Sequence, residues 1–482
     1  MVSFIIAIIL LIVGYVVYGK IVEKIFVIDS SRTTPAYTMQ DGVDYVPMKF
    51  SRIFLIQFLN IAGLGPIFGA IMGAKFGTAS FLWIVFGCIF GGAVHDYISG
   101  MISLRQGGIS LPEIHGKYLG KGIKQFMRGF MIILMVLVGV VFVVGPAGLL
   151  ANLTPESLST TFWICVILLY YIIATLLPID AIIGRIYPIF GLFLLIMVFG
   201  VLGAILIMQP ALPEIWEGIH NTHPQAEITP IFPMMFISIA CGSISGFHAT
   251  QSPLMARCMT NEKQGRQIFF GAMILEGIVA LIWAAAAIVF FQKNGMTENN
   301  PAVIVNTITK EWLGTIGSFL AILGVIAAPI TTGDTAFRSA RLILADMLHV
   351  EQKSIRKRLW IAIPLFLVGF GILIFSIYNK NGFDIIWRYF AWANQLLAAV
   401  TLWAVSVYLF QEHKIYIITL IPAVFMTMVC STYLFISPEV FGLSATLSYG
   451  IGGFISLTLL IIFLLYVRKK QSIETQTILI KK

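Results

Sequence analysis

Long apolar stretches dominate the chain, and short polar segments separate them. A membrane-spanning helix needs about 20 predominantly apolar residues, and on that basis the sequence predicts about 13 spans. They cover residues 2–19, 51–75, 78–104, 122–147, 160–178, 184–208, 230–256, 267–292, 314–340, 358–378, 383–410, 413–435 and 444–467. Short interfacial helices are expected at residues 111–120 and 301–312. The pattern therefore predicts an all-α polytopic membrane protein.

Glycine and proline interrupt two of these spans. The first interruption is NIAGLGPIFGA at residues 60–70, and the second is IACGSISGFHATQSP at residues 239–253. A break in lipid frees backbone N–H and C=O groups, so it persists only where those groups line a cavity or bind a ligand. A pair of broken spans in two halves of a chain indicates the substrate site of a secondary transporter.

Basic residues fall in alternate loops, which gives an orientation. The loop at residues 20–50 contains Lys20, Lys24, Arg32 and Lys49, whereas residues 209–229 contain no lysine or arginine. Because basic loops stay in the cytoplasm, we expect the N-terminus outside the cell membrane. The C-terminus, which follows Arg468, Lys469 and Lys470, is expected in the cytoplasm.

With this orientation the two broken spans run in opposite directions, and each begins a set of five consecutive spans. Two such sets form an inverted repeat. The predicted organisation is an N-terminal transmembrane helix and cytoplasmic loop, inverted repeat 1, an extracytoplasmic loop, inverted repeat 2, and two C-terminal helices with a cytoplasmic tail. These segments cover residues 1–50, 51–208, 209–229, 230–410 and 411–482, respectively.

Composition excludes several other classes of protein. The chain is 59% hydrophobic and 11% charged, against about 25% charged residues in soluble domains, which leaves no room for a sizeable soluble domain. The net charge of +9 lies largely in the loops and does not indicate nucleic-acid binding. The five cysteines form no CxxC motif, so neither a disulfide framework nor a zinc site is expected. No cofactor is predicted.

Two stretches of the chain are quite specific: ACGSISGFHA at residues 240–249 and DTAFRSARLILAD at residues 334–346. With several others, they resemble the carbon starvation protein A (CstA) family. The resemblance implies an inner-membrane importer of pyruvate or small peptides that is induced by nutrient limitation. It also implies kinship with the amino acid–polyamine–organocation superfamily, whose LeuT-like core is a five-plus-five inverted repeat. A histidine pair expected before the first break is absent, since the chain reads RIFLIQFL, and this leaves the substrate and the coupling ion open.

The two breaks supply the candidate substrate-binding residues. The half-helix after each break offers free N–H groups and a positive dipole end, which can receive a carboxylate. The second break adds hydroxyl, amide and imidazole side chains that suit a small polar ligand. The alternative is that the glycines serve close helix packing and that the histidine is structural. The candidates are Gly63, Gly65, Pro66, Phe68, Gly242, Ser243, Ser245, Gly246, His248 and Gln251.

Titratable residues within spans are the candidates for ion coupling, because such groups are rare in membranes and mark ion pathways. For protons these are Glu276, Asp334, His95 and Asp96. The alternative for Asp334 is a salt-bridge cluster with Arg338 one helical turn later. A sodium site is the second interpretation, formed by the carbonyls of Ala62 and Gly63 with the hydroxyls of Thr331 and Thr332. Those hydroxyls could instead bond carbonyls of their own helix.

These features predict a secondary active symporter that works by alternating access. Its expected substrate is pyruvate, another small carboxylate or a short peptide, imported in the starvation response and coupled to H+, with Na+ as the alternative. The other interpretations are a sodium-coupled amino-acid or peptide transporter and, after it, a channel or a nutrient sensor. An enzyme is not expected, since the chain contains no HExxH or GxGD motif. The expected partners are a small molecule and the lipid bilayer; oligomeric state is not predicted.

Overall fold

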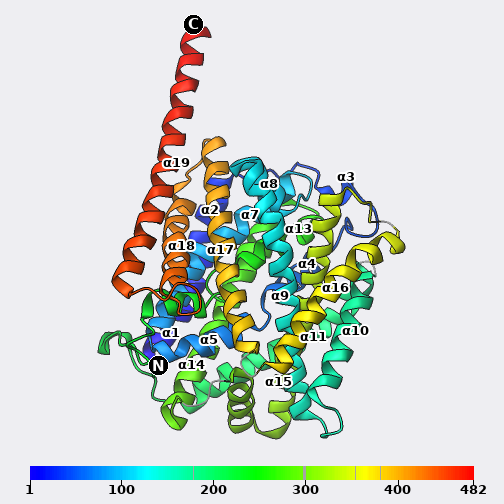
Figure 1. Ribbon diagram of the computed structural model, residues 1–482, viewed down its shortest axis with the longest axis vertical. Coiled ribbons are helices and arrows are strands. Elements are labelled where there is room, and N and C mark those ends of the chain that lie inside the picture. The colour runs from blue at the N-terminus through cyan, green and yellow to red at the C-terminus, as the bar shows by residue number, and fades with distance from the viewer. Residues whose placement is uncertain (177–178, 297–299, 353, 380–381, 482) are drawn as a thin grey trace.

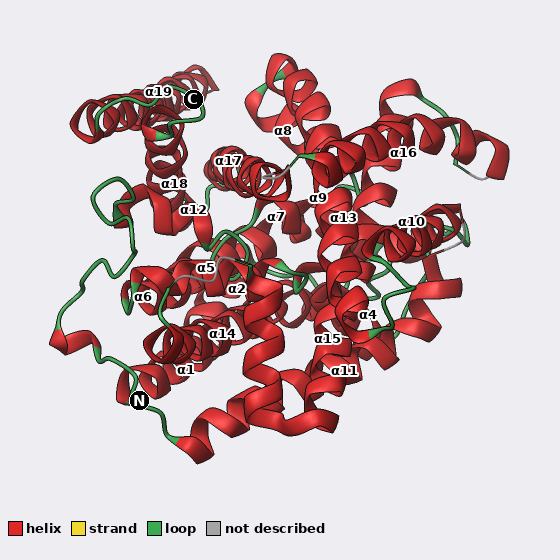
Figure 2. Cartoon of the chain, turned by 60° about the horizontal axis from the view of Figure 1, so that its bottom comes forward, coloured by secondary structure: helices red, strands yellow, loops and turns green. Residues whose placement is uncertain are grey.

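The structure is a computed structural model that describes residues 1–176, 179–296, 300–352, 354–379 and 382–481. The side chains of residues 176–188, 383–384 and 474–481 lie outside this description. Within the described residues every regular element is helical, and Figure 2 shows helices joined by loops without a strand. The all-α prediction is confirmed.

An N-terminal helix precedes the first set of spans. It comprises α1 (Val2–Val13), a short π-helix η1 (Gly14–Tyr18) and α2 (Gly19–Phe26), and the short α3 (Pro35–Thr38) follows. The first set contains α4 (Phe50–Ile61), η2 (Gly65–Gly69), α5 (Ala70–Gly73), η3 (Ala74–Phe76), α6 (Ala79–Phe86), η4 (Gly87–Gly92), α7 (Ala93–Arg105), α8 (Leu111–Leu119), α9 (Lys121–Leu153), α10 (Thr160–Leu176) and α11 (Ile179–Met208).

The second set follows the loop that contains η5 (Ile215–Glu217). It contains η6 (Ile231–Met235), α12 (Phe236–Ser238), α13 (Gly246–Ala256), η7 (Glu262–Gln264), η8 (Arg266–Gly271), α14 (Ala272–Asn294), α15 (Pro301–Leu348), α16 (Ile355–Tyr378) and α17 (Gly382–Gln411). The chain then continues through α18 (Ile417–Ile436) and α19 (Ala445–Lys481). The two ends of the chain lie at opposite ends of the bundle, and α19 projects beyond it (Figure 1).

Each predicted span coincides, over its described residues, with one helix or with several consecutive helical segments. Ten helices of the described residues are long and apolar enough to cross a membrane, and a bent pair adds an eleventh. The predicted number, about 13, is larger because two predicted spans fall below this length test. One is the described part of α10, Thr160–Thr175, and the other is the second broken span with its short α12. The expected helix at 301–312 is the first arm of α15, which turns at Gly314, where φ is 67°.

Both predicted breaks are present. In the first, α4 ends at Ile61 and η2 begins at Gly65, and the flanking segments are bent by 49°. In the second, α12 ends at Ser238 and α13 begins at Gly246, with Gly242 at φ +74°. A positive φ is costly for residues with a Cβ, so the glycine permits this turn. Around the breaks, α15 packs along α9 and α11, while α13 packs against α7, α17 and α4.

Candidate substrate and ion-coupling site

The two breaks lie against each other in the centre of the protein. A Cβ added at Gly65 would overlap the Cβ of Cys241, and one added at Gly69 would lie 2.8 Å from the carbonyl oxygen of Ser238. A Cβ added at Gly242 would lie 2.5 Å from the Cβ of Ala280 and 3.7 Å from the Cα of Pro66. Glycine is therefore needed here for close approach as well as for backbone conformation. The sequence predicted the two breaks; their contact comes from the structure.

A chain of titratable side chains crosses the second break. The Asp96 carboxylate lies between two histidines, with Oδ1 2.7 Å from Nδ1 of His95 and Oδ2 3.0 Å from Nδ1 of His248. On the other edge of the His248 ring, Nε2 lies 3.3 Å from Oε2 of Glu276. All four side chains have no solvent exposure. Helices α7, α13 and α14 thus contribute a carboxylate, an imidazole and a carboxylate to one line.

This line of side chains is tied to the backbone of the break. The backbone N–H of Gly242 donates to Oε1 of Glu276 over 3.3 Å. A helix N-terminus carries N–H groups without intrahelical partners, and Glu276 therefore provides a negative partner close to the start of α13. A change in the charge of Glu276 would act directly on the backbone at the break.

A second partner of the break comes from α17. Oδ1 of Asn394 accepts the backbone N–H of Phe247 at 2.6 Å and lies 3.1 Å from the hydroxyl of Ser245. The same amide supplies the acceptor that an N-cap side chain normally gives to a helix. Gln395, the next residue, donates to the carbonyl of Phe236 on α12. Both amides of α17 therefore form hydrogen bonds across to the second broken span.

The predicted residues do not all gather at this site. Ser243 lies against Gly92 of η4, where an added Cβ would overlap the Ser243 carbonyl oxygen. Gln251 lies further along α13, and its Nε2 donates to the hydroxyl of Ser339 on α15 over 3.3 Å. Asp334 is not part of the Asp96–His248–Glu276 line; the charges that act on it are those of Arg338 and Arg341. Phe68 is buried beside Trp387, with ring centroids 6.0 Å apart.

The residues of the predicted sodium site are close together, with one difference in the backbone partner. The hydroxyl of Thr332 donates to the carbonyls of Leu59 at 3.1 Å and Ala328 at 3.0 Å. Thr331 donates to the Ala328 carbonyl at 2.7 Å. A Cβ added at Gly63 would lie 3.0 Å from Oγ1 of Thr332. The carbonyl that these hydroxyls reach on α4 is that of Leu59, rather than those of Ala62 and Gly63.

Comparison with protein families places this architecture in a known group. The family described as carbon starvation protein CstA matches residues 1–155, 150–319 and 302–433. The chain belongs to the CstA family. A peptide transporter CstA of Helicobacter pylori (strain J99) is 27% identical, and the match covers 86% of this chain and 78% of that protein.

Other similar proteins differ in name and in the share of the chain that they match. An uncharacterized membrane protein of Haemophilus influenzae is 44% identical over 58% of this chain and 89% of its own. The pyruvate/proton symporter BtsT of Escherichia coli is 29% identical over 333 residues, which are 55% of this chain and 46% of that protein. The family assignment confirms the resemblance in the sequence.

Solved structures show the same fold at low sequence identity. MhsT in complex with L-phenylalanine aligns with a TM-score of 0.58 and 12% identity, over 87% of this chain and 98% of that one. A manganese transporter of Eremococcus coleocola aligns with a TM-score of 0.56 and 12% identity, over 90% and 99%. Both have the LeuT-like fold, so this part of the prediction is confirmed for the CstA-family chain.

Sequence reasoning missed two buried amides of α4. Gln57 and Asn60 have no solvent exposure, and the side-chain nitrogen and oxygen atoms of both make no hydrogen bond to described residues. Buried polar groups are normally hydrogen-bonded, so these amides mark a place where a polar ligand, an ion or water would be favourable. Two amides three residues apart, one turn before a break, were a signal for this.

Proposed function

We propose that the chain is a secondary active symporter that imports a small carboxylate together with a proton. The observation that carries the proposal is the buried line of Asp96, His248 and Glu276 across the second break. Charged groups in a dry interior are stable only when paired and hydrogen-bonded. Asp96 and Glu276 each contact His248, so the three groups can change their shared number of protons while remaining partnered, which suits a proton-binding site.

The geometry suggests how a proton and an anion would be coupled. While Glu276 is ionised, its Oε1 accepts the N–H of Gly242 and supplies negative charge at the break. Protonation of Glu276 removes that charge, and the N–H of Gly242 at the break then becomes available to another carboxylate. A substrate anion would thus bind better after the proton than before it, which is the condition for symport.

The contact between the two breaks supports a small substrate. Gly65 and Cys241 leave no space between the two interruptions in this conformation, so a ligand must separate them in order to bind. A monocarboxylate such as pyruvate requires less separation than a peptide, and the relative BtsT is named a pyruvate/proton symporter. Short peptides are the second candidate, because several family relatives are named peptide transporters. Gly63, Pro66, Phe68, Ser245 and Gly246 remain the proposed lining residues.

Sodium coupling is the alternative, and one observation favours it. Thr331 and Thr332 bring two hydroxyls next to the carbonyls of Leu59 and Ala328, and oxygen atoms of this kind are ligands for hard cations. Proton coupling requires Glu276 but not Thr332, whereas sodium coupling requires Thr332 but not Glu276. They can therefore be separated with two substitutions.

The deciding experiment is uptake of labelled pyruvate into proteoliposomes under separately imposed proton and sodium gradients. We expect accumulation with a proton gradient at zero sodium. Glu276→Gln should abolish accumulation but leave pyruvate exchange, because exchange requires no net proton release. Thr332→Ala should retain most of the proton-driven accumulation, because the Thr332 hydroxyl bonds the carbonyls of Leu59 and Ala328 and lies outside the Asp96–His248–Glu276 line.

The control is Asp334→Asn, which removes a buried carboxylate outside the proposed line. Accumulation that follows a sodium gradient at fixed pH, and that is lost in Thr332→Ala but retained in Glu276→Gln, would establish the sodium alternative. If Asp334→Asn loses accumulation and Glu276→Gln retains it, the coupling site is at Asp334 and not at Glu276. Uptake of labelled dipeptides in place of pyruvate would change the proposed substrate and leave the coupling test intact.

A further inference from the structure

A second group of buried charges lies away from the central site. It comprises four arginines from three helices: Arg257 at the end of α13, Arg338 and Arg341 on α15, and Arg358 on α16. Their exposed fractions are 7%, 0%, 0% and 4%, respectively. Arg257, Arg338 and Arg358 each act electrostatically on Arg341, and all three repel it. Burial of like charges is unfavourable unless anions compensate them.

One compensating anion comes from the loop between α2 and α4. Asp44 is 5% exposed and attracts both Arg341 and Arg358. Its backbone is fastened to the end of α13, since the thiol of Cys258 lies 3.8 Å from the Asp44 carbonyl and the N–H of Met48 donates to the Cys258 carbonyl. The next residue, Tyr45, donates to the carbonyl of Gly107 and stacks under the Arg257 guanidinium. The loop thus carries a carboxylate into the arginine group.

Hydrogen-bond capacity in this group is incompletely used. Nη1 of Arg341 donates to Oε1 of Gln352, whereas Nε and Nη2 are buried and make no hydrogen bond to described residues. Oδ1 of Asp44 is likewise buried and makes none among them. A guanidinium presents its donors as a planar fork that matches a carboxylate. Nε and Nη2 of Arg341 are therefore available to a carboxylate, and the charge of Asp44 attracts this guanidinium.

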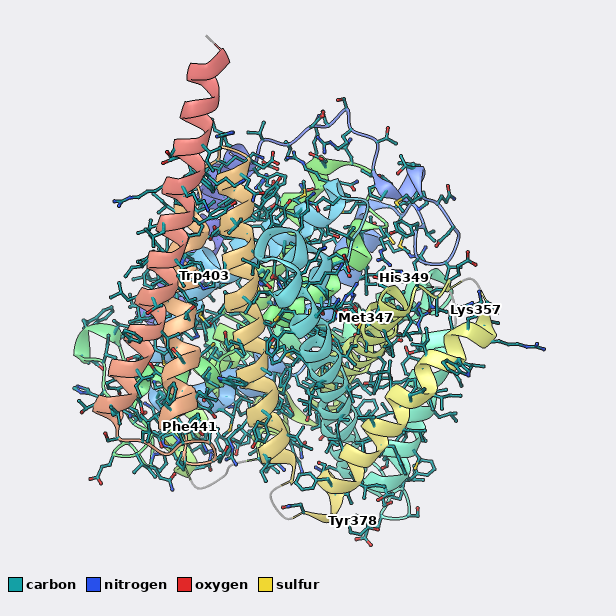
Figure 3. All side chains as sticks on the ribbon, turned by 45° about the horizontal axis from the view of Figure 1, so that its top comes forward. Met347, His349, Lys357, Tyr378, Trp403 and Phe441 are labelled. Atoms are coloured by element: carbon teal, nitrogen blue, oxygen red, sulfur yellow. The ribbon has the colours of Figure 1, made fainter. Side chains whose placement is uncertain are left out.

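The arginine group lies at one end of the interface between α13 and α15, here called the seam, and the central site lies at the other end. Helix α13 carries His248 near its start, and Arg257 directly follows its last residue; the Gln251–Ser339 hydrogen bond crosses from α13 to α15 between them. A cavity of about 20 Å³ lies beside Arg257 and Ser339, which is room for about one water molecule. Figure 3 shows Met347, His349 and Lys357, which mark the connection from α15 to α16, on one side of the protein.

We propose that Arg341, together with Arg257 and Arg358, forms a second carboxylate-binding site on this face, and that Asp44 holds the place of the ligand when the seam is closed. The ligand is a small monocarboxylate, the transported solute itself, so the inference rests on the proposed function. Because the loop at residues 20–50 is expected in the cytoplasm, the site would receive the solute on its way into the cell. Displacement of Asp44 by the solute would release the loop.

The test is the number of pyruvate molecules that bind per chain. Labelled pyruvate is titrated against the full-length protein in nanodiscs. Wild type should bind one pyruvate, at the central site, because Asp44 competes at the second. Asp44→Asn should bind two. The second should bind at least about tenfold more tightly than in wild type, because one hydrogen bond to a charged group changes the binding affinity by a factor of about ten or more. Labelled acetate should fill the same second site.

The matched control is Asp41→Asn, which removes one negative charge from the same loop at an exposed position. It should bind like wild type. Because Arg341→Gln alone would leave Asp44 buried without its partner, the variant used is Asp44→Asn with Arg341→Gln, in which both charges are removed. It should lose the second pyruvate.

The outcomes separate this inference from the proposed function. If Asp44→Asn binds one pyruvate and wild type binds none, the second site stands and the central site does not take pyruvate. If wild type and Asp44→Asn bind equal numbers, there is no second site, whatever the uptake result. Retention of the second pyruvate in the double variant would also overturn the assignment to Arg341.

Discussion

At the scale of single residues, the central site depends on side chains that satisfy the backbone of a broken helix from outside. Glu276 accepts the N–H of Gly242, and Asn394 accepts the N–H of Phe247. Each comes from a different helix, so the first bond fixes the position of the break relative to α14 and the second fixes α13 relative to α17. An unsatisfied N–H in a buried position costs about 1–3 kcal/mol, which gives these two residues a structural role beside any part in transport.

Asn394→Ala should lower the stability of the protein by about 1–3 kcal/mol, because it leaves the N–H of Phe247 and the hydroxyl of Ser245 without their partner. The measurement is the free energy of unfolding by denaturant in detergent micelles, together with the apparent affinity for pyruvate. Asn394→Asp retains the acceptor oxygen and should lose less of both. If Asn394→Ala and wild type have equal free energies of unfolding, the Asn394 side chain does not stabilise the start of α13.

At the scale of elements, the important contact is between the two broken spans. Helix breaks usually expose backbone to a ligand or water, but here η2 and residues 239–245 also touch each other. The separation allows no side chain at Gly65, where an added Cβ would overlap both the Cβ and the sulfur of Cys241. The closed arrangement of the two half-helices therefore requires a glycine opposite a cysteine.

Gly65→Ala should prevent this closed contact and reduce pyruvate uptake at least about tenfold, since overpacking a tight interior costs roughly 1–3 kcal/mol. Cys241→Gly removes the atoms that the added methyl group would meet, so the double substitution should recover part of the uptake. The comparison is initial uptake rate at equal amounts of protein in the liposomes. Failure of the double variant to exceed Gly65→Ala would show that the contact with Cys241 is not what requires the glycine.

At the scale of the whole molecule, the bundle has distinct ends. The N-terminus lies at one end and the C-terminus at the other (Figure 1), as expected for a chain that crosses the membrane an odd number of times. Residues 20–50, which include Asp44, contain Lys20, Lys24, Arg32 and Lys49, whereas the loop at residues 209–229 contains no lysine or arginine. The distribution of charge predicts which end is cytoplasmic.

Labelling with a membrane-impermeant maleimide in whole cells tests that orientation. The background is Cys165→Ala, because Cys165 is the exposed thiol among the described cysteines and Cys88, Cys241, Cys258 and Cys430 are buried. Glu227→Cys, in the loop expected outside, should react in intact cells. Lys469→Cys, in the tail expected inside, should react only after the cells are opened. The reverse pattern would invert the orientation and place the second carboxylate site outside.

The sequence by itself determined the helical class, the positions of the spans and the two breaks, because each depends on hydrophobicity and on glycine and proline within a short stretch. It also identified His248, Asp96 and Glu276 individually, since a titratable residue within a span is conspicuous. It grouped Asp334 with them, although Asp334 lies with the arginines of α15.

Only the tertiary structure decided which of these residues meet. The contact between Asp96 and His248 joins positions 152 residues apart, and the bond from Phe247 to Asn394 joins positions 147 apart. Local patterns indicate which face of a helix is polar but not which helix it will face, because that choice depends on how all the helices pack together. The approach of Thr332 to Leu59 and the burial of Asp44 among arginines were set by the same packing.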